Sequence, residues 1–150
     1  MEKLISYPIS FVGYTLFLTV LTIFHPIQWV CLNVFGYQAH KKSVDYLNLC
    51  LLRVGQVLGT TYKFENIESI PKGVPIIFVS NHQSMYDIIA IFWFLRRFHP
   101  KFVSKKELGS GIPSVSYNLR HGGSVLIDRK APKQAIPLIK GLSEYIELHK

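Results

Sequence analysis

The longest charge-free segment of this chain lies at its N-terminus. From Leu4 to His40 there is no Asp, Glu, Lys or Arg, and the segment includes the apolar run Phe11–Phe24. As one straight helix it would extend about 55 Å at about 1.5 Å per residue, well beyond the roughly 30 Å hydrocarbon core of a bilayer. The segment therefore has to be divided if it lies in or on a membrane.

The pair His25-Pro26, near the middle of this segment, is the natural place for a break. A proline inside a helix removes a backbone hydrogen bond and clashes with the preceding turn. We expect two helical arms, 8–24 and 27–37, that form a membrane-anchoring hairpin over residues 1–40. One span followed by an interfacial helix, or a buried core helix of a soluble protein, are the alternatives. A secretory signal fits less well, because no small-residue cleavage site follows the apolar run.

The composition also favours a membrane-associated protein and indicates what the chain attracts. Charged residues make up only 17% of it, hydrophobic residues 49%, and the net charge is +8. Nearly all of that excess lies between Arg96 and Lys133, where nine Lys and Arg stand against two acidic residues. Such a segment attracts polyanions, including lipid headgroups and phosphorylated substrates. It lacks the interleaved aromatic residues of nucleic-acid-binding proteins, so we expect no nucleic-acid partner.

Residues 41–150 alternate between helical and strand patterns. Apolar residues recur at helical spacing from Ser43 until Gly59 supplies a stop. Further helices are predicted at 84–98, 112–120 and 135–149. Strands are predicted at 60–67, 75–80, 102–103 and 124–127. The strand at 75–80 is apolar on both faces and is therefore expected to be central and covered. The alternation predicts an α/β fold, a sheet flanked by helices, preceded by the apolar helical hairpin.

A polar cluster follows the most apolar of these strands, where residues 81–87 read Asn-His-Gln-Ser-Met-Tyr-Asp. Loops at the carboxyl ends of strands are where α/β proteins place their sites. If the next helix begins at Ser84, His82 lies just before it and Asp87 lies in its first turn, close enough to hold the imidazole. An imidazole fixed in this way can take a proton from an alcohol as a general base.

Two plainer interpretations of the cluster stay open. Ser84 and Asp87 also have the spacing of a helix capping box, in which the carboxylate only accepts a backbone N–H. A single histidine before a helix is more often structural than catalytic. His82 has no second ligand at metal-binding spacing, and neither Cys31 nor Cys50 belongs to such a pattern, so no metal site is expected.

Three segments of the chain resemble conserved blocks of a known family. Asn81-His82, separated by four residues from Asp87, resembles the NHxxxxD block of the glycerophospholipid acyltransferases, in particular the 1-acyl-sn-glycerol-3-phosphate acyltransferases. Residues 102–108 (Phe-Val-Ser-Lys-Lys-Glu-Leu) and 123–129 (Gly-Ser-Val-Leu-Ile-Asp-Arg) are similar to two later blocks, in the same order. The apolar N-terminus resembles the family's membrane anchor.

The resemblance implies a glycerol-phosphate acyltransferase-like domain over 41–150 and a reaction of phospholipid biosynthesis. An acyl group passes from an acyl thioester, on coenzyme A or acyl carrier protein, to the free sn-2 hydroxyl of lysophosphatidic acid, which gives phosphatidic acid. His82 would deprotonate that hydroxyl and Asp87 would orient His82. The protein would bind no cofactor of its own, and it would lie at a membrane with its catalytic part on the cytoplasmic side.

The resemblance also assigns substrate-binding residues in the later blocks. Arg129 would bind the acceptor phosphate, because its guanidinium offers a planar fork that matches phosphate oxygens. Lys105 would contact the phosphates of the acceptor or of coenzyme A, or only attract anionic lipid, and Gly123 would line the same site. Asp128 is expected to position the chain.

One expected block of the family does not occur in the chain. No Phe-Pro-Glu-Gly-Thr-Arg segment is present before Lys150. We therefore expect the α/β domain to be incomplete at its C-terminus, as a fragment or a truncated homologue. The main functional alternative is a non-catalytic membrane-surface protein that binds anionic lipid through the basic segment 96–133.

Overall fold

The computed structural model describes residues 2–71, 73–74, 76–131, 133, 136–138 and 141. They belong to two compact units, the first formed by residues 1–17 and 48–100 and the second by residues 18–47 and 101–150. The helix predicted at 135–149 lies largely outside the described residues. Both long N-terminal helices contribute residues to each unit.

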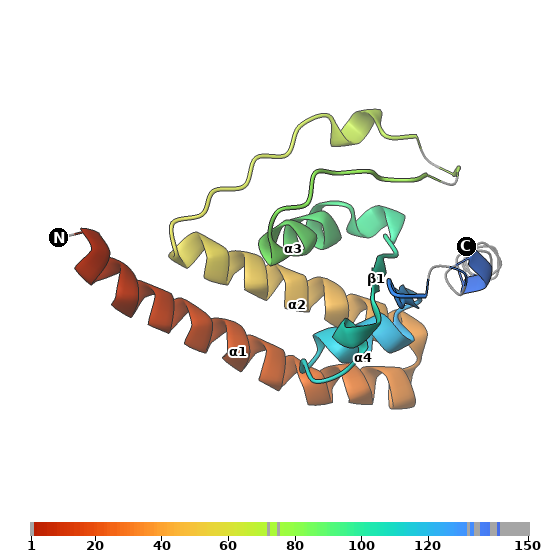
Figure 1. Cartoon of the computed structure of the whole chain (residues 1–150), viewed down its shortest axis with the longest axis horizontal. Coiled ribbons are helices and arrows are strands. Elements are labelled where there is room, and N and C mark those ends of the chain that lie inside the picture. Colours follow the sequence, from red (N-terminus) through yellow and green to blue (C-terminus); the bar gives the residue numbers. More distant parts are fainter. Residues whose placement is uncertain are drawn as a thin grey trace. The chain divides into compact units, whose positions relative to one another are not determined.

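The apolar N-terminal segment forms a single helix, α1 (Glu2–Phe35), and Figure 1 shows it without interruption. The predicted break at His25-Pro26 is therefore wrong. Pro26 does remove the hydrogen bond that its N–H would make to the carbonyl of Thr22, but the helix continues through it. The chain turns instead at Gly36, whose φ of 82° lies in the left-handed region that glycine adopts without strain.

The loop before helix α4 (Val115–His121) contacts α1 in the turn before the proline. The fully buried Ser114 donates its hydroxyl to the carbonyl of Leu21 at 2.7 Å. Its backbone N–H donates to Nδ1 of His25 at 3.1 Å. A hydroxyl from a distant part of the chain thus donates to the carbonyl of Leu21, one residue before the Thr22 carbonyl that Pro26 leaves without its N–H donor.

The apolar window of α1 is long enough to cross a membrane. It runs from Tyr7 to Phe35, 29 residues, and an 18-residue stretch of it has a mean hydropathy of 1.6. At about 1.5 Å per residue it extends about 44 Å, against the roughly 30 Å of a hydrocarbon core. Only Gly13, Phe17, Leu21 and Gln28 are buried in this window, so most of its apolar side chains face outward.

Helix α2 (Tyr37–Val57) confirms the predicted amphipathic helix. Its buried face carries apolar residues at helical spacing, namely Val44, Leu47, Leu51 and Val54. The predicted stop at Gly59 is also confirmed. Gly59 has a φ of 86°, its N–H donates to the carbonyl of Gln56, and the N–H of Thr60 donates to that of Gly55. This pair of bonds is a Schellman ending, which requires a left-handed residue at the position of Gly59.

The two strands predicted at 60–67 and 75–80 are wrong. The described residues of both segments, 60–67 and 76–80, are irregular apart from a short 3-10 turn that begins at their end, η1 (Ile67–Ser69), and Figure 1 draws them without arrows. Ile77 and Val79 are each 90% exposed, the opposite of a covered central strand. A strand needs a neighbouring ladder for its backbone groups. No neighbouring strand pairs with these segments in the described part of the chain.

Aromatic contacts hold these irregular segments against the next helical layer of the first unit. That layer consists of α3 (Met85–Phe94) and the 3-10 turn η2 (Arg96–Phe98), where a single helix to residue 98 was predicted. The rings of Phe64 and Phe94 stack with centroids 4.4 Å apart. Phe78 packs on Phe98 at 6.0 Å. Phe78 therefore faces the helices while its neighbours Ile77 and Val79 point outward.

The second unit contains a small parallel sheet. Strand β1 (Val103–Lys105) pairs with β2 (Val125–Ile127) in parallel, with Val103 opposite Val125 and Lys105 opposite Ile127. The connection runs through the 3-10 turn η3 (Lys106–Gly109) and α4. Two parallel strands joined by a helical crossover are the basic motif of an α/β fold. The larger flanked sheet that the sequence predicts is not present among the described residues.

Candidate active site

The first turn of α3 is built by Ser84 and Asp87. Ser84 is the N-cap, and its hydroxyl accepts the N–H of Tyr86 at 3.2 Å. The Oδ2 atom of Asp87 accepts the N–H of Ser84 and that of Gln83, each at 2.8 Å. These bonds satisfy donors that a helix start leaves without partners. The predicted capping box is therefore present.

The same oxygen of Asp87 also lies beside His82. Nδ1 of the imidazole is 3.4 Å from Oδ2 of the carboxylate. The carboxylate therefore caps the helix and contacts the histidine at the same time, so the two interpretations are compatible. The side chains of His82 and Asp87 are 53% and 38% exposed, so the ring can be reached from solvent.

The electrostatics of the pair suit a histidine that accepts protons. The N–H donors of Gln83 and Ser84, and then His82, hold the pKa of the Asp87 carboxyl below its usual value. The carboxylate is therefore ionised at neutral pH and faces Nδ1 of the ring, which favours the tautomer with its hydrogen on that nitrogen. With that hydrogen on Nδ1, the other nitrogen, Nε2, carries the free lone pair of a general base.

Lys105 and Arg129 lie at the other predicted site, in the second unit. Lys105 ends β1 directly opposite Ile127, which ends β2, and Arg129 follows two positions later. Because the strands are parallel, both end on the same side of the sheet, and both basic residues lie at that end. Lys105, Lys106, Arg129 and Lys130 are all exposed. This group, called here the basic edge, offers a cationic surface to phosphate.

The turn before β2 explains why glycines precede it. Gly123 has a φ of 82°, which favours glycine. At Gly122 a Cβ atom would come within 2.6 Å of the carbonyl oxygen of Asn118. After β2, Oδ1 of Asp128 accepts the N–H of Lys130 at 2.9 Å. Asp128 thus orders the turn that carries Arg129, the positioning role that the sequence predicts for it.

Lys101 is a candidate residue that the sequence prediction missed. Its ammonium donates to the hydroxyl of Tyr37 and to the carbonyl of Gly122, both at 2.5 Å. Burial, and after it the charge of Lys41, lowers its pKa from 10.5 to about 8. Lys101 thus fixes the Gly122–Gly123 turn that leads into β2. In the sequence it is only one cation of the basic segment, and its place just before a strand was the one available signal.

A second missed feature is a buried polar pair in the second unit. Gln28 of α1 and His40 of α2 are 0% and 1% exposed. The His40 ring meets the ring of Tyr117 edge-on, with centroids 5.7 Å apart. Burial lowers the pKa of His40, so the ring is neutral at physiological pH. No spacing in the sequence distinguishes this histidine from the exposed His82.

The structure brings the predicted residues together in two groups. His82 and Asp87 are in contact in the first unit. The short sheet of the second unit carries the other three: Gly123 precedes β2, Lys105 ends β1, and Arg129 follows the end of β2 by two positions. In the described part of the chain, no three His, Cys, Asp or Glu side chains gather closely enough to hold a metal ion.

Comparison with known proteins gives one match. No curated protein and no solved structure matches the chain. A family model described as Acyltransferase matches residues 61–150, a range that includes the His82–Asp87 pair, Lys105 and the turn from Gly123 to Arg129. Because the match covers more than half of the chain, this protein belongs to the glycerophospholipid acyltransferase family.

Proposed function

We propose that the protein transfers an acyl group from an acyl thioester to the sn-2 hydroxyl of lysophosphatidic acid. Membership of the family supports a general role in acyl transfer. The observation that carries the finer proposal is the contact between His82 and Asp87, 3.4 Å apart at an exposed helix start. A histidine that has one nitrogen on a carboxylate and the other open to solvent is suited to activate an alcohol.

The proposed reaction proceeds in two steps. Nε2 of His82 takes the hydroxyl proton while the alcohol oxygen bonds to the thioester carbonyl carbon. The tetrahedral intermediate then collapses, the carbon–sulfur bond breaks, and the imidazolium returns its proton to the leaving thiolate. The products are phosphatidic acid and a free thiol. The acyl donor is acyl coenzyme A or an acylated acyl carrier protein.

The basic edge supports a phosphorylated acceptor. Arg129 and Lys105 leave the sheet on the same side, and both are exposed. A guanidinium binds two phosphate oxygens at once, whereas an ammonium acts as a point charge. We therefore assign the acceptor phosphate to Arg129 and a supporting charge to Lys105. Arg129→Lys should raise the KM for lysophosphatidate and leave the KM for the acyl donor unchanged.

The long apolar helix α1 supports a membrane location. The acceptor and the product are both lipids, and α1 is long and apolar enough to span a bilayer. Lys41 and Lys42 follow the C-terminal end of α1, whereas Lys3 is the one Lys or Arg before its apolar segment. Under the positive-inside rule, this difference favours a catalytic part on the cytoplasmic side.

Replacing His82 tests the proposed function. Purified chain in mixed micelles is supplied with acyl coenzyme A and lysophosphatidate, and released thiol is measured. His82→Ala should lower turnover by roughly 10²- to 10⁴-fold, the usual contribution of a general base. His121→Ala, which removes an exposed histidine of α4, is the matched control and should retain turnover. Unchanged turnover in His82→Ala would exclude the proposed base.

Binding of anionic lipid without chemistry is the second candidate, and the four exposed cations of the basic edge favour it. The same preparation distinguishes the two candidates. Binding to phosphatidate vesicles without any thiol release, under conditions where donor and acceptor are both present, would support the lipid-binding role. Thiol release that depends on both lysophosphatidate and His82 would support the enzyme.

A further inference from the structure

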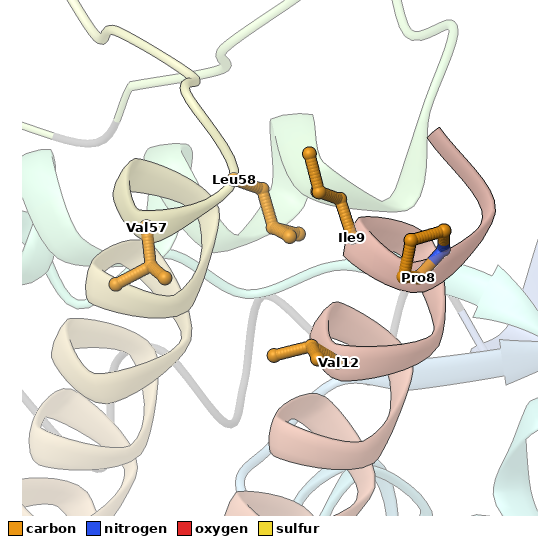
Figure 2. A pocket seen from close by; sticks show the side chains of 5 residues that line it. All are labelled: Pro8, Ile9, Val12, Val57 and Leu58. Atoms are coloured by element: carbon orange, nitrogen blue, oxygen red, sulfur yellow. The ribbon is translucent and has the colours of Figure 1, made fainter. Parts of the chain in front are cut away.

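An apolar groove lies between the start of α1 and the end of α2. Figure 2 shows Val12 of α1 and Leu58, just after α2, pointing into the space between the two helices. The groove has a volume of about 240 Å³ and is lined by Pro8, Ile9, Val12, Val57 and Leu58. All of these residues belong to the first unit, which also contains His82 and Asp87.

The chemistry of the lining restricts what the groove can hold. None of its five side chains carries a hydrogen-bonding group or a charge. Three of them are large apolar side chains that remain open to the surroundings, since Ile9 and Val12 are each 48% exposed and Val57 is 70% exposed. A continuous open apolar patch of this kind marks a binding surface for apolar matter. A hydrocarbon chain fits the groove, whereas a polar headgroup or a nucleotide does not.

The face of α1 that lines the groove continues to the candidate active site. One turn along, Gly13 leaves room for Leu58, since a Cβ atom there would come within 2.6 Å of the leucine methyls. Another turn along, Phe17 packs edge-on against Tyr86, with ring centroids 6.1 Å apart. Tyr86 is the neighbour of Asp87 in the first turn of α3. From Ile9 to Phe17 the helix advances about 12 Å.

We propose that this groove holds the acyl chain already present on the lysophospholipid acceptor. The inference rests on the proposed function, because it assigns a place to the apolar part of that substrate. The acceptor is a single-chain amphiphile that stays in the membrane. The groove lies at the N-terminal end of the apolar window Tyr7–Phe35, where a chain can enter sideways from the lipid. The donor thioester, by contrast, arrives on a water-soluble carrier.

A substitution that fills the groove tests the proposal kinetically. Val12→Trp places a large ring between the helices, and Phe11→Trp adds bulk at a neighbouring position that is 73% exposed and outside the lining. For acceptors with long acyl chains, Val12→Trp should raise the KM at least tenfold. For acceptors with short chains and for the whole donor series, the KM should not change. The assignment of the groove to the acceptor's acyl chain would be wrong if Val12→Trp and Phe11→Trp changed the KM for long-chain acceptors equally. It would also be wrong if Val12→Trp changed only the KM for the acyl donors.

Photocrosslinking tests the groove without requiring turnover. A lysophosphatidate with a diazirine near the end of its acyl chain is bound to the full chain carrying His82→Ala, irradiated, and the labelled peptides are identified. Label should lie on the peptides that contain Ile9, Val12 and Leu58. Unlabelled lysophosphatidate should displace it. Label elsewhere, or displacement by acyl coenzyme A or by diacyl phosphatidylcholine as readily as by lysophosphatidate, would overturn the proposal.

The two experiments separate failure of the groove from failure of the proposed function. If the wild-type chain releases no thiol but is labelled specifically in the groove, the groove binds the acyl chain and the proposed acyltransferase activity is wrong. The opposite outcome is turnover that depends on His82 while the label lies elsewhere and Val12→Trp keeps the wild-type dependence on acceptor chain length. That result would support the acyltransferase activity and exclude the groove as the site of the acceptor's acyl chain.

Discussion

One carboxylate oxygen of Asp87 contacts three different groups. It accepts the N–H groups of Gln83 and Ser84 at 2.8 Å each and lies 3.4 Å from Nδ1 of His82. The two backbone donors fix the carboxylate at the start of α3, and the fixed carboxylate in turn restrains the imidazole. The helix cap is therefore the support on which the proposed base depends.

Asparagine at position 87 should separate capping from catalysis. Asp87→Asn keeps an oxygen that can accept the backbone N–H groups, but it removes the charge that stabilises the imidazolium. We expect a loss of at least about 10² in turnover with little change in the thermal midpoint. Thiol release and thermal unfolding, measured on the same preparation, check both parts.

Ser84→Ala is the converse variant. It removes the hydroxyl that accepts the N–H of Tyr86 and leaves Asp87 and His82 in place. An N-cap lost in this way costs about 1 kcal/mol of stability. We expect a lower midpoint of unfolding and turnover within a few-fold of wild type. A loss of turnover as large as that of Asp87→Asn would show that the cap alone explains the effect of Asp87.

Lys101 gives the protein a predictable dependence of stability on pH. Burial holds its folded pKa near 8, whereas the unfolded value is 10.5. Between these values the unfolded chain binds a proton that the folded chain has released, so stability rises with pH. Below pH 8 both states bind the proton and this contribution does not change. Urea unfolding followed by tryptophan fluorescence should show the rise between pH 8 and 10.5.

Lys101→Met provides the comparison for this titration. It removes the titrating group, so the stability difference between wild type and variant should increase in favour of wild type across the same pH window. A difference that stays constant from pH 7 to 10.5 would mean that Lys101 titrates normally and is not desolvated.

Sequence distance decides which site residues could be predicted. His82 and Asp87 belong to one local segment, so the beginning of a helix is sufficient to bring them together. Lys101 contacts Tyr37 and Gly122, which are 64 and 21 positions away. His40 is buried by packing between helices. Such contacts depend on the tertiary fold, which one sequence without further information does not specify.

The same reasoning applies to the secondary-structure elements. Helix α2 and the start of α3 were predicted because spacing, capping and glycine stops act within a few residues. The strands at 60–67 and 75–80 were predicted from apolar content alone, yet a strand forms only where another strand supplies a ladder. The break at Pro26 was predicted from local chemistry, yet α1 continues through the proline and the chain turns at Gly36.

The glycine turn before β2 allows a test at the level of one element. Gly123→Ala forces a side chain into a φ of 82°, which costs about 1–2 kcal/mol. Gly111→Ala, at a φ of 84° and with open space around it, carries the same backbone penalty away from the motif. Both variants should lose similar stability in urea unfolding.

Only Gly123→Ala should also affect the acceptor. The turn at Gly122–Gly123 leads through β2 to Arg129, so a shift there moves the proposed phosphate ligand. We expect a higher KM for lysophosphatidate in Gly123→Ala and an unchanged value in Gly111→Ala. Equal KM values in the two variants would confine the role of Gly123 to folding.

The first and last segments that resemble blocks of the family lie in different compact units. The His82–Asp87 pair belongs to the first unit and the basic edge to the second, and α1 and α2 each contribute residues to both. The long helices are therefore part of the framework of each site, and α1 is also the helix for which we propose a membrane role. A test of the membrane role must for this reason leave the packing of α1 intact.

Arginine at an outward-facing position near the middle of α1 meets that condition. Ile23 is 53% exposed and lies in the window Tyr7–Phe35, so Ile23→Arg disturbs little internal packing. In a bilayer, however, a central arginine costs about 2.5–3.5 kcal/mol. We expect Ile23→Arg to move the chain from the membrane fraction toward the soluble fraction in vesicle flotation. Tyr46→Arg, at a 61% exposed position of α2, is the control and should float like wild type. If Ile23→Arg floats like wild type as well, α1 is not in the hydrocarbon, and the proposed membrane role of this helix is wrong.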